Sequence, residues 1–444
     1  MTKHPIAPTP RAPFSLRTYR AATSFLKPVA NYALKQRLKA GKEDAARIGE
    51  RRGVASTPRP EAPLLWVHGA SVGESLSILP LIDRLSSQMP KVRFLVTTGT
   101  VTSAELMAER LPATAIHQYA PIDQPDFVRA FFDHWQPDAG LFVESELWPV
   151  LIGEAQSRAI PLAIVNGRLS PKSFRGWSRR PRTARALLDA FQVILGQDEG
   201  NAERLGLLAG RDVTMPGNLK RAAPPLPSDD EAIATLQKSV GDRCVWLAAS
   251  THPGEEEFIL DVHRQLTADL PGLLTILAPR HPNRGDEVAT LIANAGLPLT
   301  RRSEGMLPSE ATAVYLADTL GELGIFYRLS NVAFIGGSLT PVGGHNPMEP
   351  ARLGSAIVTG PNVFNFQETF QSMRKAGALA LVRNERDLSA SLLRLLTDAR
   401  TRETMSSRAL QWSEEGAEQV LTETITALSA IFPPVFEAPT SPPT

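Results

Sequence analysis

The sequence predicts an α/β protein with two domains, each built on a doubly wound parallel β-sheet. In both halves of the 444-residue chain, short apolar segments alternate with segments of helical periodicity, which is typical of parallel strands joined by crossover helices. A segment rich in proline and charge, residues 222–231, separates the halves and is typical of an interdomain linker. Two such domains are expected to face a central cleft that binds ligands.

The predicted strands are apolar segments bounded by turn residues or helical patterns: 64–68, 93–97, 139–143, 162–165 and 193–196 in the first half, and 245–249, 274–278, 314–316, 332–335 and 356–359 in the second. We expect five regions in order: a basic N-terminal membrane-associating segment (1–53), a first Rossmann-like domain (54–221), the linker (222–231), a second Rossmann-like domain (232–432) and a proline-rich disordered tail (433–444).

The composition excludes several classes of protein. A hydrophobic content of 43% supports packed cores and excludes a disordered chain. The single cysteine, Cys244, excludes an intramolecular disulfide framework, and its apolar surroundings indicate a small core residue. We expect no signal peptide, and no segment approaches the ~18 consecutive apolar residues of a membrane-spanning helix.

Charge is distributed unevenly along the chain. Residues 1–53 carry 12 Lys/Arg and 3 Asp/Glu, a net charge of +9, whereas the remainder carries 35 and 43, a net charge of −8. Aromatic and aliphatic residues interleave with these cations between residues 14 and 39. This pattern favours a helix lying on an anionic membrane surface, while a solvated helix or a nucleic-acid-binding arm also fits it.

The segment 334–366 carries the strongest signal for a binding site. A predicted strand runs into Gly336-Gly337, and Asn346 is then expected to be a helix N-cap, with Pro347 first in the helix and Glu349 three residues after the cap. Helix N-termini bind phosphate, and paired glycines let a ligand approach the backbone. Glu349 is a candidate acceptor for ribose hydroxyls. A capping box without a ligand is the competing interpretation.

Residues 69–74 follow the first predicted strand and support two chemical interpretations. Gly69-Ala70-Ser71-Val72-Gly73 matches the G-x-S-x-G pattern of a hydrolase nucleophile elbow, which makes Ser71 a candidate nucleophile. In the other interpretation Glu74, at the head of the next helix, takes a proton from an acceptor hydroxyl. His345 is the last histidine of the chain, so an acid–histidine pair late in the sequence does not stand out.

Other candidate residues also follow predicted strands, where parallel sheets bind ligands. Glu144 and Glu146 come after strand 139–143, and Lys220 lies near the linker, where its charge suits a phosphate. In the second half, the candidates are Ser250, Thr251, Arg280 and the segment Asp318–Leu323. We expect no metal site, because no His/Cys cluster or Asp-x-Asp has ligand spacing.

These motifs together resemble the 3-deoxy-D-manno-octulosonic acid (Kdo) transferases, bacterial enzymes that transfer Kdo from CMP-Kdo to the lipid A precursor. The resemblance runs from Arg47 to about residue 385. It rests on the ordered motifs 47–53, 71–74, 144–149, 166–168, 217–220, 250–252, 255–257, 279–282, 321–323, 336–361 and 365–366. It implies a GT-B fold and metal-free, inverting transfer without a cofactor.

The resemblance also implies a role for each candidate residue. Glu74 would be the general base, while Glu144 and Lys220 would support the transition state. CMP would be held by Ser250, Thr251, Arg280, His281, Gly321, Glu322, Leu323, Asn346, Pro347, Met348 and Glu349. Ser71 would then be a turn residue. The sequence departs from the family at Lys220-Arg221 and in an N-terminal segment that charges interrupt.

The expected partners follow from the same resemblance. They are CMP-Kdo, the lipid A precursor and the cytoplasmic face of the cell inner membrane, and nucleic acid is not expected. The alternative function, which the residues alone leave open, is a serine hydrolase of the α/β type that uses Ser71.

Overall fold

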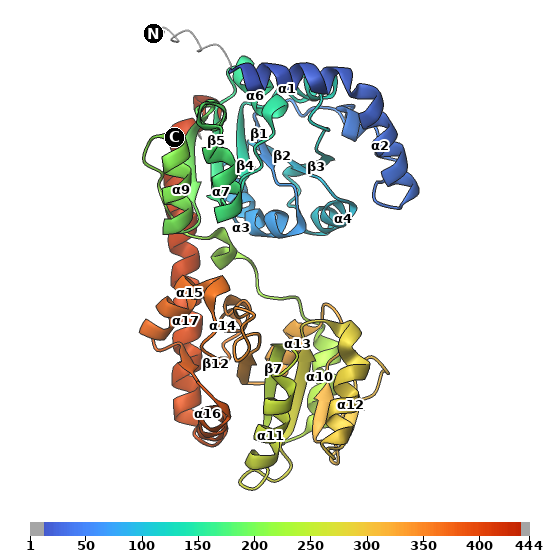
Figure 1. The fold of residues 1–444 in the computed structure, drawn as a ribbon, viewed down its shortest axis with the longest axis vertical. Coiled ribbons are helices and arrows are strands. Elements are labelled where there is room, and N and C mark those ends of the chain that lie inside the picture. Colours follow the sequence, from blue (N-terminus) through green and yellow to red (C-terminus); the bar gives the residue numbers. More distant parts are fainter. Residues whose placement is uncertain (1–12, 437–444) are drawn as a thin grey trace, which may run out of the picture. The chain divides into compact units, whose positions relative to one another are not determined.

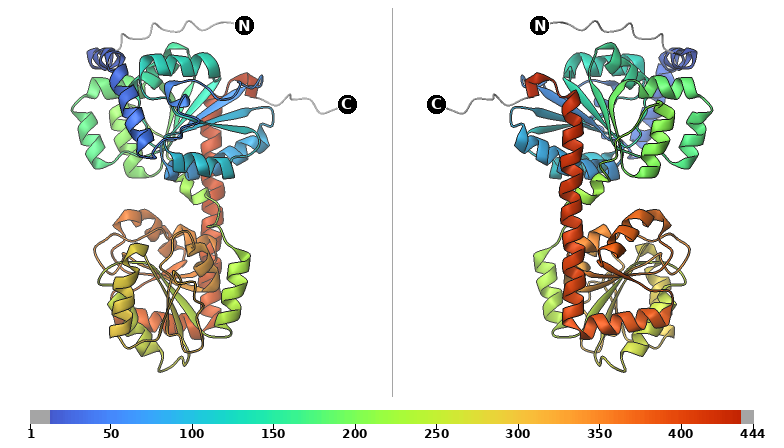
Figure 2. Two further views of the ribbon diagram at one scale, coloured as in Figure 1. Left: turned by 90° about the vertical axis from the view of Figure 1, so that its right-hand side faces the viewer. Right: turned by 90° about the vertical axis from the view of Figure 1, so that its left-hand side faces the viewer.

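The computed structural model describes residues 13–436, and the chain forms two compact units (Figure 1). The first unit extends to Ala223 and takes up the chain again from Ala417, and the second unit is Pro224–Gly416. Each unit is a parallel-sheet α/β domain with helices on both faces of its sheet (Figure 2). The predicted fold class, two Rossmann-like sheet domains, is confirmed.

The first unit contains a six-stranded sheet of order β3-β2-β1-β4-β5-β6, in which every pairing is parallel. The strands are β1 (Leu64–His68), β2 (Arg93–Thr98), β3 (Ala115–Tyr119), β4 (Ala139–Val143), β5 (Leu162–Gly167) and β6 (Phe191–Gly196). The helices before the linker are α1 (Phe14–Phe25), α2 (Lys27–Lys39), α3 (Val72–Gln88), α4 (Val101–Arg110), α5 (Pro125–Trp135), α6 (Pro149–Ser157), α7 (Pro171–Ser178), α8 (Pro181–Leu188) and α9 (Glu199–Ala209). The strand order reverses between β1 and β4, which makes this the topological switch point of the sheet.

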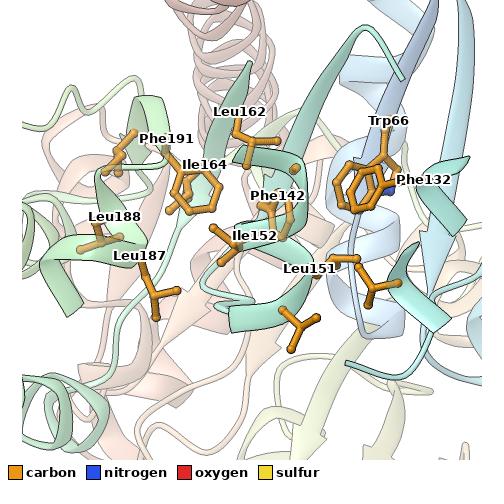
Figure 3. Close-up of a cluster of buried hydrophobic side chains, with 14 of the residues drawn as sticks. Trp66, Phe132, Phe142, Leu151, Ile152, Leu162, Ile164, Leu187, Leu188 and Phe191 are labelled. Atoms are coloured by element: carbon orange, nitrogen blue, oxygen red, sulfur yellow. The ribbon is translucent and has the colours of Figure 1, made fainter. Parts of the chain in front are cut away.

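Alternate residues of the first sheet fill two separate cores. Trp66, Phe142 and Ile164 point to one face and pack against α5, α6 and α8, as Figure 3 shows for the buried cluster around Trp66, Phe132 and Leu151. Leu65, Val67 and their equivalents on the neighbouring strands point to the other face. Burial on both faces explains why these strands are continuously apolar in sequence.

The second unit contains a seven-stranded parallel sheet of order β13-β12-β11-β7-β8-β10-β9, whose strand order reverses between β7 and β11. The strands are β7 (Val245–Thr251), β8 (Leu274–Pro279), β9 (Leu299–Arg301), β10 (Val314–Leu316), β11 (Val332–Ile335), β12 (Ala356–Thr359) and β13 (Leu379–Leu381). The helices are α10 (Asp230–Val240), α11 (Glu256–Leu266), α12 (Gly285–Asn294), α13 (Leu323–Leu329), α14 (Met348–Arg352), α15 (Gln367–Lys375), α16 (Glu385–Thr397) and α17 (Ala399–Leu428).

Three strands that the sequence analysis did not predict, β3, β9 and β13, all lie at sheet edges. An edge strand has one neighbour and needs less apolar sequence, and β9 and β13 are each only three residues long. Their sequences therefore lack the continuous apolar run that identified the central strands.

Two domain boundaries also differ from those expected. Residues 417–432 were assigned to the second domain, but Val420, Leu421 and Leu428 of α17 are buried in a core of the first unit. The tail was expected to be disordered from residue 433, yet Pro434–Phe436 form a short helical turn, and Phe436 is buried in the same core. The rest of the expected tail, 437–444, lies outside the described residues.

From residue 13 on, the N-terminal segment contains the helices α1 and α2, as its amphipathic pattern predicts, but it is part of the first unit rather than a separate region. The buried carboxylate of Glu50 accepts hydrogen bonds from the guanidinium of Arg47 at 2.9 Å and from the backbone N–H of Tyr119 at 2.7 Å. Among the residues from 13 to 436, no helix is both long and apolar enough to cross a membrane.

Candidate active site

The candidate residues of the first unit gather at its switch point. Strand β1 leads through Gly69 and Ala70 into α3, which carries Glu74 in its first turn, and β4 leads directly into Glu144. The carboxyl ends of adjacent parallel strands at a switch point form the ligand-binding crevice of doubly wound folds. The topology therefore brings Glu74 and Glu144 together, as the strand-end argument predicts.

Glu74 is held in place by a capping box. The Ser71 hydroxyl donates to Glu74 Oε1 at 2.6 Å and accepts from the Glu74 backbone N–H, while Glu74 Oε2 accepts from the Ala70 backbone N–H at 2.7 Å. The carboxyl is only 6% exposed. Burial raises the pKa of Glu74, and the nearby charges of Glu146 and Glu144 raise it further, against the hydrogen bonds from Ser71 and Ala70, which lower it. A carboxyl held in this way is a stronger base than an exposed glutamate and is suited to accept a proton.

Glu144, whose charge acts on Glu74, pairs with two cations. Its Oε1 lies 3.4 Å from the Lys220 ammonium nitrogen, and its Oε2 lies 3.9 Å from the Arg168 guanidinium. Glu144 has a φ of +59°, which is unusual for a residue with a side chain and turns the chain sharply at the end of β4. The backbone N–H of Lys220 is fixed by the Asn218 side chain at 2.9 Å. The sequence analysis did not identify Arg168 as part of this group.

In the second unit, a buried carboxylate organises the glycine loop. Glu255 is fully buried and accepts hydrogen bonds from the backbone N–H groups of Gly337 at 2.6 Å and of Ser338 and Leu339 at 2.9 Å. It also accepts from the backbone N–H of His252 at 3.1 Å. We expected the paired glycines to let a ligand approach the backbone, but in the structure the Gly337 amide binds the Glu255 carboxylate and the Gly336 amide binds the Ala249 carbonyl.

The start of α14 differs by one residue from the prediction. Asn346 was expected to be the N-cap and Pro347 the first helical residue, but Pro347 is at the cap position and α14 begins at Met348. The Asn346 side chain still accepts from the Met348 N–H at 3.1 Å, two residues on, as an N-cap side chain does, and this bond makes a turn before the helix. Asn346 also donates to Glu349 Oε1 at 3.1 Å, and burial raises the pKa of Glu349.

Three histidines and an arginine converge beside this loop. The Nε2 atoms of His252 and His345 lie 2.8 Å apart, and His281 contacts His252 with a ring centroid distance of 5.9 Å. Arg280 follows β8, has an exposed side chain and acts electrostatically on both His252 and His345. The sequence analysis assigned Arg280 and His281 to this site and did not identify the other two histidines.

Two of the remaining predicted residues of the second unit, Thr251 and Glu322, already have side-chain partners within the protein. The buried Thr251 hydroxyl donates to Glu256 at 3.0 Å, and Glu256 in turn binds Arg284 at 2.8 Å. The carboxylate of Glu322 pairs with Arg302, which lowers its pKa, and it lies between Gly321 and Leu323, the first residue of α13. Ser250 has a φ of +57° at the end of β7. Within residues 13–436, no group of three or more His, Cys, Asp or Glu side chains is arranged to hold a metal ion.

Known proteins similar to this chain share one described activity. A family model described as 3-deoxy-D-manno-octulosonic-acid transferase (kdotransferase) matches residues 46–223. The chain is 33% identical over 420 residues to a 3-deoxy-D-manno-octulosonic acid transferase of Rickettsia bellii, covering 94% of this chain and 100% of that protein. It is 35% identical over 373 residues to the enzyme of that name from Haemophilus influenzae, covering 81% and 86%.

Solved structures are similar as well. The C-terminal CMP-Kdo binding domain of WaaA from Acinetobacter baumannii is 36% identical, with a TM-score of 0.40, over 41% of this chain and 96% of that domain. The UDP-GlcNAc 2-epimerase of Neisseria meningitidis is 14% identical, with a TM-score of 0.57, over 83% of this chain and 100% of that one. At this identity the epimerase supports only the fold of two parallel-sheet domains.

Proposed function

Because this chain belongs to the 3-deoxy-D-manno-octulosonic acid transferase family, a family of glycosyltransferases, we propose that it transfers Kdo from CMP-Kdo to lipid IVA, the lipid A precursor, and releases CMP. The family match covers most of the chain and most of its relatives. The donor, the acceptor and the stereochemistry are part of the proposal, which rests on the family and on the chemistry of the two switch points.

The observation that carries the proposed mechanism is the buried carboxyl of Glu74. In an inverting transfer, the oxygen of an acceptor hydroxyl attacks the anomeric carbon of Kdo while the bond from that carbon to the CMP phosphate oxygen breaks. The hydroxyl proton passes to Glu74, and the bonding electrons leave with the phosphate. The raised pKa of Glu74 makes its carboxylate a stronger base than an exposed glutamate.

Charge at the donor is proposed to be handled by side chains rather than by a metal ion. The departing CMP phosphate gains negative charge, which Arg280 is placed to balance in the second unit. Asn346 and Glu349 present polar groups suited to the ribose, and Ser250 and Thr251 lie at the end of β7. Glu144 and Lys220 support the transition state in the first unit, where their ion pair fixes both side chains beside Glu74.

A serine hydrolase is the alternative function. In the structure the Ser71 hydroxyl donates to Glu74, and within the described residues no histidine is hydrogen-bonded to Ser71. A triad requires a histidine base at that position. The capping role of Ser71 and the family of the chain both favour transfer.

Replacing Ser71 by alanine separates these two functions. We expect the variant to keep Kdo transfer to within about tenfold, the scale of one lost hydrogen bond, because only the support of Glu74 is lost. The first unit should lose about 0.5–2 kcal/mol of stability through the missing N-cap. Transfer and esterase activity would be measured in parallel. An esterase activity that disappears in the variant would contradict the proposed function.

The first unit also presents a surface suited to a membrane. Large apolar side chains of α1 and α2 are exposed, among them Phe14 (79%), Phe25 (86%) and Tyr32 (64%). The helices are tied to the unit on their other side, where Tyr19 donates to Asp123 at 3.1 Å and Lys27 binds Asp126 at 2.7 Å. Residues 14–39 carry six Lys/Arg and no Asp/Glu, so this surface complements an anionic bilayer, and we propose that the protein lies on the cytoplasmic face of the inner membrane.

Replacing Phe14, Phe25 and Tyr32 together by serine should weaken binding to vesicles of anionic phospholipid by more than tenfold. Burial of one such side chain contributes ~1.5–3 kcal/mol, so three together exceed the ~1.4 kcal/mol that corresponds to tenfold. Vesicle flotation measures the effect. Leu207→Ser removes an exposed apolar side chain from α9 and serves as the control. Equal flotation of the triple variant and the wild type would contradict the assignment of this surface.

The proposed function is tested by the release of CMP. Incubation with CMP-Kdo should produce CMP in proportion to added lipid IVA. CMP release that does not depend on lipid IVA would contradict the proposed acceptor.

A further inference from the structure

We propose that His252 and His345 form a hydrogen-bonded imidazole pair that binds the nucleotide phosphate and takes up one proton as it does so. This inference rests on the proposed CMP-Kdo donor and deepens it. The pair lies at the switch point of the second sheet, where His252 follows β7 and His345 belongs to the loop after β11. Ligands of doubly wound sheets bind at this point.

The two imidazole rings are almost coplanar and meet at their Nε2 atoms. The Nε2 atoms lie 2.8 Å apart, the ring planes differ by only 5°, and the centroids are 5.0 Å apart. Gly337, with a φ of +65°, makes room for His345, because a Cβ atom at this position would lie 3.1 Å from Cδ2 and Nε2 of that ring. Glu255 holds the backbone at both rings, because it accepts hydrogen bonds from the N–H of His252 and from that of Gly337, beside His345.

The hydrogen bond between the rings determines what the outer nitrogen atoms do. One Nε2 must carry a proton and the other must be bare, so a neutral pair has one Nδ1–H donor and one bare Nδ1. A single added proton goes to the bare Nδ1 and leaves the bond between the rings intact. The pair then carries one positive charge and an Nδ1–H group at each end, and because these two groups point away from each other, one of them donates to a phosphate oxygen while the charge attracts the anion. Among residues 13–436, neither Nδ1 atom has a hydrogen-bond partner.

The surroundings keep the pair neutral until an anion arrives. Burial lowers the pKa of His345 to about 4, with further contributions from His252, Arg280 and His281. Burial also lowers the pKa of His252, as do His281, Arg284 and Arg280, while Glu256 raises it. The same cations attract a phosphate, whose negative charge then favours protonation of the pair. Binding and proton uptake are therefore expected to be coupled.

Calorimetric titration of the full chain with CMP tests this coupling. At about pH 7.5, above the second phosphate pKa of ~6, CMP is mainly a dianion. Titration in two buffers of different ionisation enthalpy should show proton uptake by the wild type. Cytidine, which lacks the phosphate, should bind without proton uptake. In His345→Gln the uptake should disappear and the affinity for CMP should fall about tenfold, and His252→Gln should behave in the same way.

The control is His134→Gln, which replaces a histidine of the first unit whose ring contacts the Thr57 carbonyl and should leave both quantities unchanged. Nitrogen NMR of histidine-labelled wild type needs no variant, and CMP should shift the imidazoles of the pair towards the protonated form by one proton in total. CMP binding without proton uptake, or uptake retained in His345→Gln, would overturn the role of the pair alone. No binding of CMP to the wild type would overturn both the pair and the proposed donor.

Discussion

Replacing Glu74 by glutamine is expected to lower Kdo transfer by about 10²-fold or more, the scale of general-base catalysis, with the first unit still folded. Glutamine has nearly the same shape and keeps one oxygen that can accept from the Ala70 N–H. It cannot take a proton from the acceptor hydroxyl. Steady-state transfer and circular dichroism of the same preparation measure both parts of this prediction.

The pH dependence of transfer provides a second measurement of the same residue. The base must be ionised, so activity falls as the pH drops through the pKa of Glu74. Because burial raises that pKa, the acidic limb should lie above the range of an ordinary glutamate. The raised pKa also means that ionisation of Glu74 costs stability as the pH rises through it, and Glu74→Gln removes this cost.

The matched control for Glu74 is Glu105→Gln, an exposed glutamate in α4 of the same unit. It should retain wild-type transfer and an unchanged pH profile. Near-normal turnover of Glu74→Gln, with the acidic limb in place, would remove Glu74 from the role of base.

Replacing Glu255 by glutamine is expected to destabilise the second unit by about 3 kcal/mol or more. The carboxylate accepts four backbone N–H groups while fully buried, and hydrogen bonds to a charged group contribute ~1.5–3 kcal/mol each. Glutamine keeps one acceptor oxygen and turns an NH₂ group towards the remaining donors. The loop that holds His345 should loosen as a result.

Hydrogen exchange measured by mass spectrometry locates this effect. Amides of residues 332–366 should exchange faster in Glu255→Gln, while those of the first sheet should not change. Glu257→Gln, which replaces an exposed glutamate two residues away, is the control. Unchanged protection of the loop in Glu255→Gln would show that the carboxylate does not organise it.

The central strands could be predicted from the sequence because strands buried on both faces are continuously apolar. The residues at their ends could be predicted once the strands were located. Glu144 directly follows a strand, and Glu74 lies in the first turn of the helix after a strand, so both could be predicted in this way. The edge strands were not predicted because a strand with one neighbour does not need a continuous apolar sequence. The return of α17 to the first unit was not predicted for another reason. This 30-residue helix contributes to a core of each unit without a break in its sequence.

The polar interior of the second unit was the least predictable part. Glu255 lies in a run of three glutamates, a pattern typical of an exposed helix start, and only the fold shows that its carboxylate binds the glycine loop. His252 and His345 are 93 residues apart, so no local pattern joins them. A glutamate soon after one strand end, together with a glycine pair after the adjacent strand end, is the signal that would have suggested the first of these contacts.

The most direct test of the account is chromatography of the lipid formed from CMP-Kdo and lipid IVA by the wild type, with and without EDTA, beside Glu74→Gln. The account predicts a Kdo-bearing lipid from the wild type in both conditions and, from Glu74→Gln, at a rate lower by about 10²-fold or more. Loss of the product with EDTA, or equal product from Glu74→Gln, would contradict a metal-free transfer that depends on Glu74.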